Sequence, residues 1–324
     1  METLRKPVSS FYTNGKTVKK NLDPLVSIII PAFNAEEYLK EALNSSLSQD
    51  YKNTEIIVID DDSTDKTVET ALQFKNVKLL KQPHRGACAA RNMGLIHCKG
   101  DLIKFLDSDD ILAPSIISKQ VACYLECDPH TIVYSDIAFF STSKKNSKLA
   151  TVELSQTTNQ SLQLLKTNIH TPCSLYPKNA LLAVKGFDPR FLKAQEYYLN
   201  LKLSLAGYKF LRLPGTAALA RIHNSYDRIS NQKQTKKSIE NSELRERVYI
   251  ETFNEAFDGQ IPKDIQKYFA DKIIKNALIK LCHGNFKNSL TSISNLLMIK
   301  PSPFLLTSCV VSAAMDLAIG RIKS

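Results

Sequence analysis

Short apolar runs recur along the N-terminal part of the chain and are closed by proline or acidic residues. The first two, VSIII and EIIVI, are rich in β-branched residues. Runs of this length and composition predict buried strands, because β-branched side chains pack well on a pleated surface. The predicted strands comprise residues 26–30, 55–59, 77–81 and 102–106.

Amphipathic segments separate these runs and predict helices at 36–48, 65–74 and 87–97. Asn34 and Glu37 are spaced as a capping box for the first helix. Strands that alternate with helices of this length form βαβ units with right-handed crossovers. The fold class predicted is therefore α/β, a doubly wound, mostly parallel sheet with helices on both faces.

After residue 136 the pattern is mixed, and it becomes helical from about residue 233. Three regions are predicted: a mobile basic leader at 1–22, a domain large enough to hold an active site at 23–230, and a helical C-terminal extension at 231–324. The elements expected in this later part are strands at 132–134, 137–140, 208–213 and 217–222, and helices at 195–206, 263–283 and 286–299.

Composition and charge narrow the class of protein. With 43% hydrophobic and 23% charged residues the chain is globular, and its net charge of +11 favours an anionic partner. Nucleic acid is not expected, since no binding motif or aromatic-interleaved basic stripe is present. The 7 cysteines include no CxxC pair, and no apolar signal segment opens the chain, which predicts reduced thiols in a cytoplasmic protein. The weakly polar stretch 302–320 is a poor membrane span.

Two acidic clusters follow predicted strands, at the sheet edge where doubly wound proteins bind ligands. Asp107 and Asp109 could hold Mg²⁺ or Mn²⁺ through oxygen atoms, or could belong to a solvated loop that caps the next helix. A carboxylate of Asp60 or Asp61 could bind a ribose or a base N–H, or could also act as a cap. The candidate cationic partners of these acids are Arg85, Arg91 and Lys104.

Together with several further motifs, these clusters make residues 25–228 resemble the family 2 glycosyltransferases of the GT-A fold. Each motif is short, but their order and spacing together are specific. The motifs that carry the resemblance are VSIIIPAFN at 26–34, IVIDDDSTD at 57–65, AARNMG at 89–94, KGD at 99–101, FLDSDD at 105–110, GFD at 186–188 and AQE at 194–196.

The resemblance implies a nucleotide-sugar pocket and a metal site. It places Phe33 against the base, Asp60 on the base with Asp61 close by, and Arg91 near the nucleotide. The pocket implied by the resemblance consists of Pro31, Ala32, Phe33, Asn34, Asp60, Asp61, Arg91, Asp107 and Ser108, and the metal ligands are Asp107, Asp109 and His223.

Glu196 falls on the position of the family's general base. Gln195 departs from the family pattern, where an acid precedes the base, so a neighbouring negative charge is missing. The resemblance implies an inverting, Mn²⁺- or Mg²⁺-dependent transferase that moves a sugar, most simply from a UDP-sugar, to a glycan or lipid-linked hydroxyl acceptor. The family's processive synthases carry a tryptophan motif; this chain has no tryptophan, so non-processive hexosyl transfer is expected.

Two other classes stay open. A non-catalytic protein of the same fold that binds a sugar nucleotide or carbohydrate would explain Gln195. A nucleotidyltransferase also places acids beyond a parallel sheet, but it would carry a glycine-rich basic loop where this chain has Pro31 to Asn34. From residue 286 onward, apolar residues at helical spacing are flanked by Lys and Arg. That face fits either an anionic membrane surface or packing on the catalytic domain or on a second copy, as in a homodimer.

Overall fold

The computed structural model describes residues 21–141, 144, 147–156, 159–192, 194–222, 236–282, 292, 294–302, 305–310 and 313. Two compact units make up the chain: one is Ser10–Asn231 and the other includes Gln232–Ser324. Most of the predicted leader, residues 1–20, and the predicted metal ligand His223 lie outside the described residues. Each unit is described below by itself.

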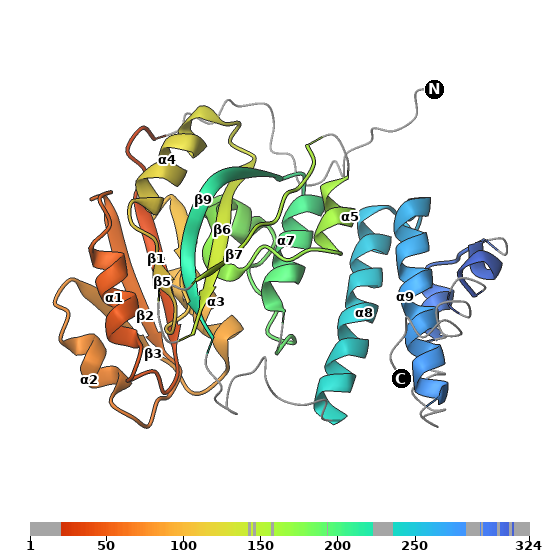
Figure 1. Ribbon diagram of the computed structural model, residues 1–324, viewed down its shortest axis with the longest axis horizontal. Coiled ribbons are helices and arrows are strands. Elements are labelled where there is room, and N and C mark those ends of the chain that lie inside the picture. The colour runs from red at the N-terminus through yellow and green to blue at the C-terminus, as the bar shows by residue number, and fades with distance from the viewer. Residues whose placement is uncertain are drawn as a thin grey trace. The chain divides into compact units, whose positions relative to one another are not determined.

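A single mixed sheet organises the larger unit (Figure 1), with strand order β3-β2-β1-β4-β8-β6-β9-β5 and β7 paired to β6. Strands β3, β2, β1 and β4 run parallel, whereas β8 runs antiparallel to both β4 and β6. β6 and β9 form a long parallel pair. The strands are β1 (Val26–Ala32), β2 (Thr54–Asp60), β3 (Val77–Lys81), β4 (Leu102–Phe105), β5 (Ile111–Leu112), β6 (Thr131–Phe140), β7 (Lys148–Ala150), β8 (Ser174–Pro177) and β9 (Lys209–Arg221).

Helices cover both faces of this sheet. Along β1, Ile28 and Ile30 join one hydrophobic core with α1, α2 and α4, while Ile29 joins a second core with α3, α6 and α7. The alternation follows from the two-residue period of a strand, and it confirms the predicted doubly wound α/β class. The helices are α1 (Leu39–Leu47), α2 (Thr67–Leu72), α3 (Ala87–His97), α4 (Ile116–Glu126), α5 (Gln160–Leu164), α6 (Lys178–Ala183) and α7 (Gln195–Leu205), with a 3₁₀ turn at Thr171–Cys173.

The smaller unit contains the helices α8 (Lys236–Ala256) and α9 (Lys263–Cys282). Phe253 on α8 meets Phe269 on α9 edge to face, with ring centroids 5.6 Å apart. The predicted helix 263–283 is thus confirmed to Cys282, whereas much of the predicted helix 286–299 lies outside the described residues. Across the described ranges, no helix has both the length and the apolar character needed to cross a membrane.

Local predictions fail at two kinds of place. The capping box is wrong: α1 begins at Leu39, and the Asn34 side chain instead accepts a hydrogen bond from the Thr64 backbone N–H (2.9 Å). The predicted strand pairs in 132–140 and 208–222 are single strands, β6 and β9. Asp136 interrupts the apolar pattern of β6 and lies at a register shift. Its two carboxylate oxygens accept hydrogen bonds from the Arg212 guanidinium (2.7 and 2.8 Å), so the buried charge is paired.

Candidate active site

The carboxyl ends of β1 and β2 lie side by side and place the first predicted site residues together. Ala32 pairs with Asp60 at the end of the two strands, and the Asp61 backbone N–H donates to the Ala32 carbonyl (2.8 Å). Pro31 and Ala32 are buried as the last residues of β1. They support the sheet edge, and the loop that follows them presents its side chains to solvent.

Phe33 begins that loop and leaves 46% of its surface exposed, which is unusual for a large aromatic side chain beside a buried strand. Its ring packs on the His84 ring at a centroid distance of 4.3 Å. Asn34 has a left-handed backbone (φ 46°), a conformation that asparagine tolerates better than most residues. An exposed, supported aromatic ring at this edge is suited to stack on a planar base.

Asp60 and Asp61 are both 3% exposed, yet their carboxylates have different surroundings. The Asp61 carboxylate accepts from the Gln82 amide (2.6 Å) and from the backbone N–H groups of Arg85 (2.9 Å) and Gly86 (2.8 Å). It therefore shapes the 82–86 loop. The Asp60 carboxylate accepts one long bond, from the Ser63 N–H (3.3 Å). Of the two, Asp60 has more capacity left to accept a hydrogen bond from a ligand.

His84 belongs to this same corner, although its sequence context gave no signal for it. Its Nδ1 lies 3.1 Å from the Asp61 carbonyl and 3.1 Å from the Asp61 carboxylate. Because both of these neighbours are acceptors, the contact requires a proton on Nδ1. The contact joins residues far apart in the sequence, so only the fold could reveal it.

Arg91, on α3, bridges two parts of the site. One guanidinium nitrogen donates to Asp107 Oδ1 (2.5 Å) and the other to Gln195 Oε1 (2.7 Å). Burial disfavours the charge of Arg91, which is 6% exposed, but the Asp107 carboxylate outweighs this and raises the pKa of the guanidinium. With both ends engaged, Arg91 fixes the end of β4 to the start of α7.

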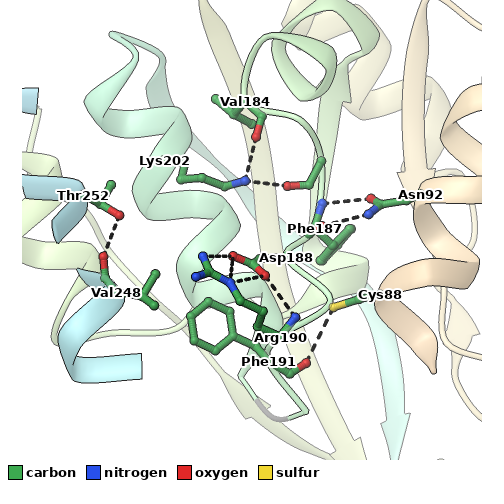
Figure 2. Close-up of polar contacts among 11 residues, drawn as sticks. Cys88, Asn92, Val184, Phe187, Asp188, Arg190, Phe191, Lys202, Val248 and Thr252 are labelled. Atoms are coloured by element: carbon green, nitrogen blue, oxygen red, sulfur yellow. Dashed lines mark hydrogen bonds and ion pairs between the residues drawn. The ribbon is translucent and has the colours of Figure 1, made fainter. Parts of the chain in front are cut away.

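The GFD motif at 186–188 packs against the Arg91 side chain that forms this bridge. The Phe187 ring lies 5.1 Å beneath the Arg91 guanidinium, and the Phe187 backbone is held at both N–H (2.9 Å) and carbonyl (2.8 Å) by the Asn92 amide. Figure 2 shows Lys202 of α7 reaching the same loop, where it donates to the carbonyls of Val184 and Gly186 (2.6 and 2.7 Å). Burial lowers the pKa of Lys202 to about 8. The motif thus locks α3 and α7 together.

The acidic turn that follows β4 is held by the end of β9. The Arg221 backbone N–H donates to Asp110 Oδ1 (3.1 Å), its Nε donates to the Asp109 carbonyl (3.4 Å), and its guanidinium pairs with Glu41 of α1. Two aromatic rings, each 4.7 Å away, enclose that guanidinium. The rings belong to Tyr38 and Phe140. Arg221 therefore anchors the turn that carries the candidate metal ligands.

The donor set of this turn fits a hard divalent cation. Asp107 has one oxygen on Arg91 and a side chain that is 35% exposed, and Asp109 and the half-buried Ser108 share its turn. Carboxylate oxygens are the ligands that Mg²⁺ and Mn²⁺ prefer, and Mg²⁺ is commonly held by one or two of them plus substrate phosphates. No group of three or more potential ligands is found in the part of the chain that the structure describes, and that part excludes His223.

Glu196 stands in the first turn of α7, half-buried, next to the Arg91 bridge. Its Oε1 accepts a hydrogen bond from the Asn168 amide at 2.7 Å. Gln195 uses both ends of its own amide: the oxygen accepts from Arg91, and the nitrogen donates to the carbonyls of Phe191 (3.1 Å) and Leu192 (3.3 Å). A glutamate at this position could accept from Arg91 but could not donate to the two carbonyls. Gln195 therefore also ties the start of α7 to the preceding residues Phe191 and Leu192.

Residues 27–184, just under half of the chain, match the model of glycosyl transferase family 2. This match confirms, over that part of the chain, the resemblance that the motifs carry.

Two curated relatives match part of the chain. An uncharacterized glycosyltransferase of Haemophilus influenzae is 42% identical over 133 residues, 40% of this chain and 53% of that protein. The Escherichia coli UDP-Glc:alpha-D-GlcNAc-diphosphoundecaprenol beta-1,3-glucosyltransferase WfgD is 42% identical over 107 residues, 32% of this chain and 42% of that protein. The match thus spans about half or less of these relatives.

Two solved structures share the fold over more of the chain. S. aureus TarS 1–349 in complex with UDP-GlcNAc gives a TM-score of 0.63 at 19% identity, covering 91% of this chain and 92% of that one. The mannosyltransferase PcManGT of Pyrobaculum calidifontis, in complex with GDP-Man and Mn²⁺, gives 0.51 at 18% identity, covering 92% and 79%. At these identities the likeness concerns the fold.

Proposed function

We propose that this protein is an inverting, metal-dependent glycosyltransferase that moves a hexose from a nucleotide sugar to a hydroxyl acceptor, one sugar at a time. The observation that carries the proposal is the Arg91 bridge, which joins Asp107 at the end of β4 to the α7 turn that holds Glu196. A donor site and a base must lie close together for one acceptor atom to reach both.

In this mechanism the base of the donor stacks on Phe33 and its N–H groups meet Asp60. The donor diphosphate lies along the 107–109 turn, where Asp107 and Asp109 would hold Mg²⁺ or Mn²⁺. A bound cation there supplies positive charge that offsets the charge of the leaving diphosphate. The hydroxyl oxygen of the acceptor attacks the anomeric carbon from the face opposite the nucleoside diphosphate, which leaves. Glu196 accepts the proton of that hydroxyl.

UDP-sugars are the proposed donors, and a glycan or lipid-linked saccharide is the proposed acceptor. The E. coli relative supports both, since its name specifies UDP-glucose and a diphosphoundecaprenol-linked sugar. TarS, a structural neighbour, was solved with UDP-GlcNAc. A cytoplasmic enzyme that works at the inner face of a membrane would meet both substrates, and a net charge of +11 would draw it to anionic lipid.

Nucleotide-sugar turnover tests the proposal directly. The full chain is incubated with Mn²⁺ and, one at a time, UDP-glucose, UDP-GlcNAc, UDP-galactose, GDP-mannose and a dTDP-hexose, with and without a polyprenyl-diphosphate-linked sugar. Release of nucleoside diphosphate is measured, and the anomeric configuration of the product is read by NMR. We expect release from a UDP-sugar with inversion; retention would contradict the mechanism.

Binding without turnover would favour the second candidate, a non-catalytic protein that binds sugar nucleotides. The neutral Gln195 beside the base position is the observation that favours it, because an acidic neighbour is the family's usual arrangement there. Calorimetric binding of UDP, with no release of UDP from any donor under any acceptor condition, is the result that would establish this alternative.

Metal dependence is tested by binding. We expect UDP to bind much more weakly in EDTA than in Mn²⁺. Without a bound cation, the negative diphosphate would face the negative carboxylates of the 107–109 turn. Asp109→Ala should weaken binding in Mn²⁺ to the level of the wild type in EDTA. The exposed Asp128→Ala is the matched control and should bind UDP normally. Equal calorimetric affinity of the wild type with and without Mn²⁺ would remove the metal from the proposal.

Glu196→Gln tests the base. The substitution keeps the shape of the side chain and removes its basicity, so UDP affinity should change little while turnover falls roughly 10²–10⁴-fold, the range of general base catalysis. Steady-state kinetics and calorimetry on the same preparation give both numbers. Preserved turnover with lost UDP binding would assign Glu196 to the donor site instead.

A further inference from the structure

A short loop outside the matched motifs lies against the proposed base. It follows α5, and its residue Asn168 donates from Nδ2 to Glu196 Oε1 at 2.7 Å. The same nitrogen lies 3.3 Å from Nδ1 of His170, whose ring packs edge-on against Phe139. Asn168 is half-buried, and it matches none of the sequence motifs.

A second contact ties this loop to the helix that carries the base. Asn200 stands one turn after Glu196 on α7, so both side chains lie on the same face of the helix. The Asn200 amide donates to the Ile169 carbonyl (3.1 Å) and accepts from the Tyr176 hydroxyl (3.0 Å). Asn200 is fully buried. The loop and the base therefore sit in a fixed relation, set by two hydrogen bonds to one helix.

The orientation of the Asn168 amide is defined by the carboxylate. If the amide were turned over, its oxygen would face Glu196 Oε1 and two acceptors would repel each other. In the observed orientation Asn168 Oδ1 is buried and has no hydrogen-bond partner in the described chain. A buried unpartnered acceptor costs stability. The orientation that directs the amide N–H group at Glu196 therefore leaves Asn168 Oδ1 buried without a partner, which lowers stability.

We propose that Asn168 is the positioning residue of the base: it holds Glu196 Oε1, so that Oε2 is the oxygen that faces the acceptor hydroxyl. This inference rests on the proposed function, because it requires Glu196 to act as the base. A fixed rotamer of Glu196 keeps its free oxygen in line with the acceptor hydroxyl. The amide itself exchanges no proton.

Asn168→Asp is the sharpest variant, because it keeps the shape and replaces the donor with a second acidic group. Two carboxyl groups in hydrogen-bond contact share a proton, so the pair ionises at higher pH than Glu196 does beside an amide. We expect turnover to fall about 10–100-fold at neutral pH, by analogy with the loss seen when the hydrogen-bond partner of a metal ligand is removed. The acid limb of the turnover–pH profile should move to higher pH, with donor KM and UDP affinity nearly unchanged.

Asn179→Asp is the matched control, the same chemical change at an exposed position on α6, and should leave kinetics and pH profile as in the wild type. Asn168→Ala removes the donor without adding charge and should cost less turnover, with little shift of the acid limb. UDP affinity and the thermal transition of each variant report whether it has folded.

A double-variant comparison separates positioning from a general structural effect. If Asn168 acts through Glu196, Asn168→Ala should cost nothing further in the Glu196→Gln background. Independent, multiplying losses would overturn the inference, as would wild-type turnover and pH profile in Asn168→Asp. A strong loss in Glu196→Gln with no effect of Asn168→Asp would reject the inference and leave the proposed function intact. Full turnover in Glu196→Gln, or no donor turnover by the wild type, would reject the proposed base or function itself.

Discussion

At the scale of single residues, the site depends on groups whose partners are distant in sequence. Lys104 illustrates this best: as a lysine beside an acidic strand end, it is a natural candidate to bind those acids. Instead it is completely buried in β4 and donates to Gln120 Oε1 (2.7 Å), whose own amide donates to the Cys173 carbonyl (2.8 Å). Burial lowers the pKa of Lys104 to about 7.

This lysine makes stability depend on pH with a defined sign. Its pKa is about 7 in the folded chain and about 10.4 in an unfolded one. Between these values the unfolded state binds more protons, so the contribution of Lys104 to stability rises with pH. Lys104→Met should therefore stabilise the protein most at pH 7 and below, by an amount on the order of 1–3 kcal/mol after the loss of the Gln120 bond.

Urea unfolding at pH 6.5, 8 and 9.5 measures this difference. The stabilisation by Lys104→Met should shrink steadily as the pH rises. Replacement of the exposed Lys99 by Met serves as the control for the loss of one positive charge. A stability difference for Lys104→Met that stays constant over this range would contradict the lowered pKa of Lys104.

At the scale of elements, α3 is the helix that aligns the site, and its contact with the sheet is close. A Cβ added to Gly94 would lie 2.4 Å from Ile29 Cγ2 and 2.9 Å from Ile59 Cδ1. Gly94 stands one turn after Arg91, so the same face of the helix meets the sheet and carries the bridge to Asp107. Small residues at this position let α3 pack directly on β1 and β2.

Gly94→Ala should therefore lower stability and also weaken UDP binding at the proposed donor site. Overpacking against two buried isoleucines typically costs about 1–3 kcal/mol, and an outward shift of α3 would lengthen the Arg91–Asp107 contact. Urea unfolding and UDP calorimetry measure the two effects. Ile96→Ala, at a 72% exposed position of the same helix, is the control and should change stability by less than about 0.5 kcal/mol. A Gly94→Ala variant with normal stability and affinity would show that α3 tolerates displacement.

Local pattern was sufficient where an element is regular and its contacts are near in sequence. Helix α3 was predicted with its observed bounds, and the strand ends correctly placed Asp60 and Asp107 at one sheet edge. It failed where a distant partner decides the outcome. Asn34 accepts a hydrogen bond from Thr64 and does not cap its own helix. Asp136 stays within a strand because it is paired with Arg212. Asn168 and His84 contact candidate site residues that are distant in the sequence. Such contacts leave no periodic trace in the sequence.

At the scale of the whole molecule, charge and the C-terminal tail bear on where the protein acts. The chain carries a net charge of +11, and its last segments combine apolar residues with lysine and arginine. Within the described part of the tail, Leu297 and Val310 are 73% and 49% exposed. An apolar face with flanking cations fits the headgroup region of an anionic membrane, and packing on another protein surface is the competing interpretation.

Vesicle flotation distinguishes these two interpretations of the tail. We expect the full chain to float partially with vesicles that contain phosphatidylserine at low salt, and much less with neutral phosphatidylcholine vesicles. Added salt should reduce flotation, because the Debye length falls from about 30 Å at 0.01 M to about 8 Å at 0.15 M ionic strength. Truncation before Lys300 should abolish flotation, and UDP binding by the truncated protein checks that the larger unit remains folded. A full chain that does not float at low salt would assign the tail to packing within the protein or against a second copy.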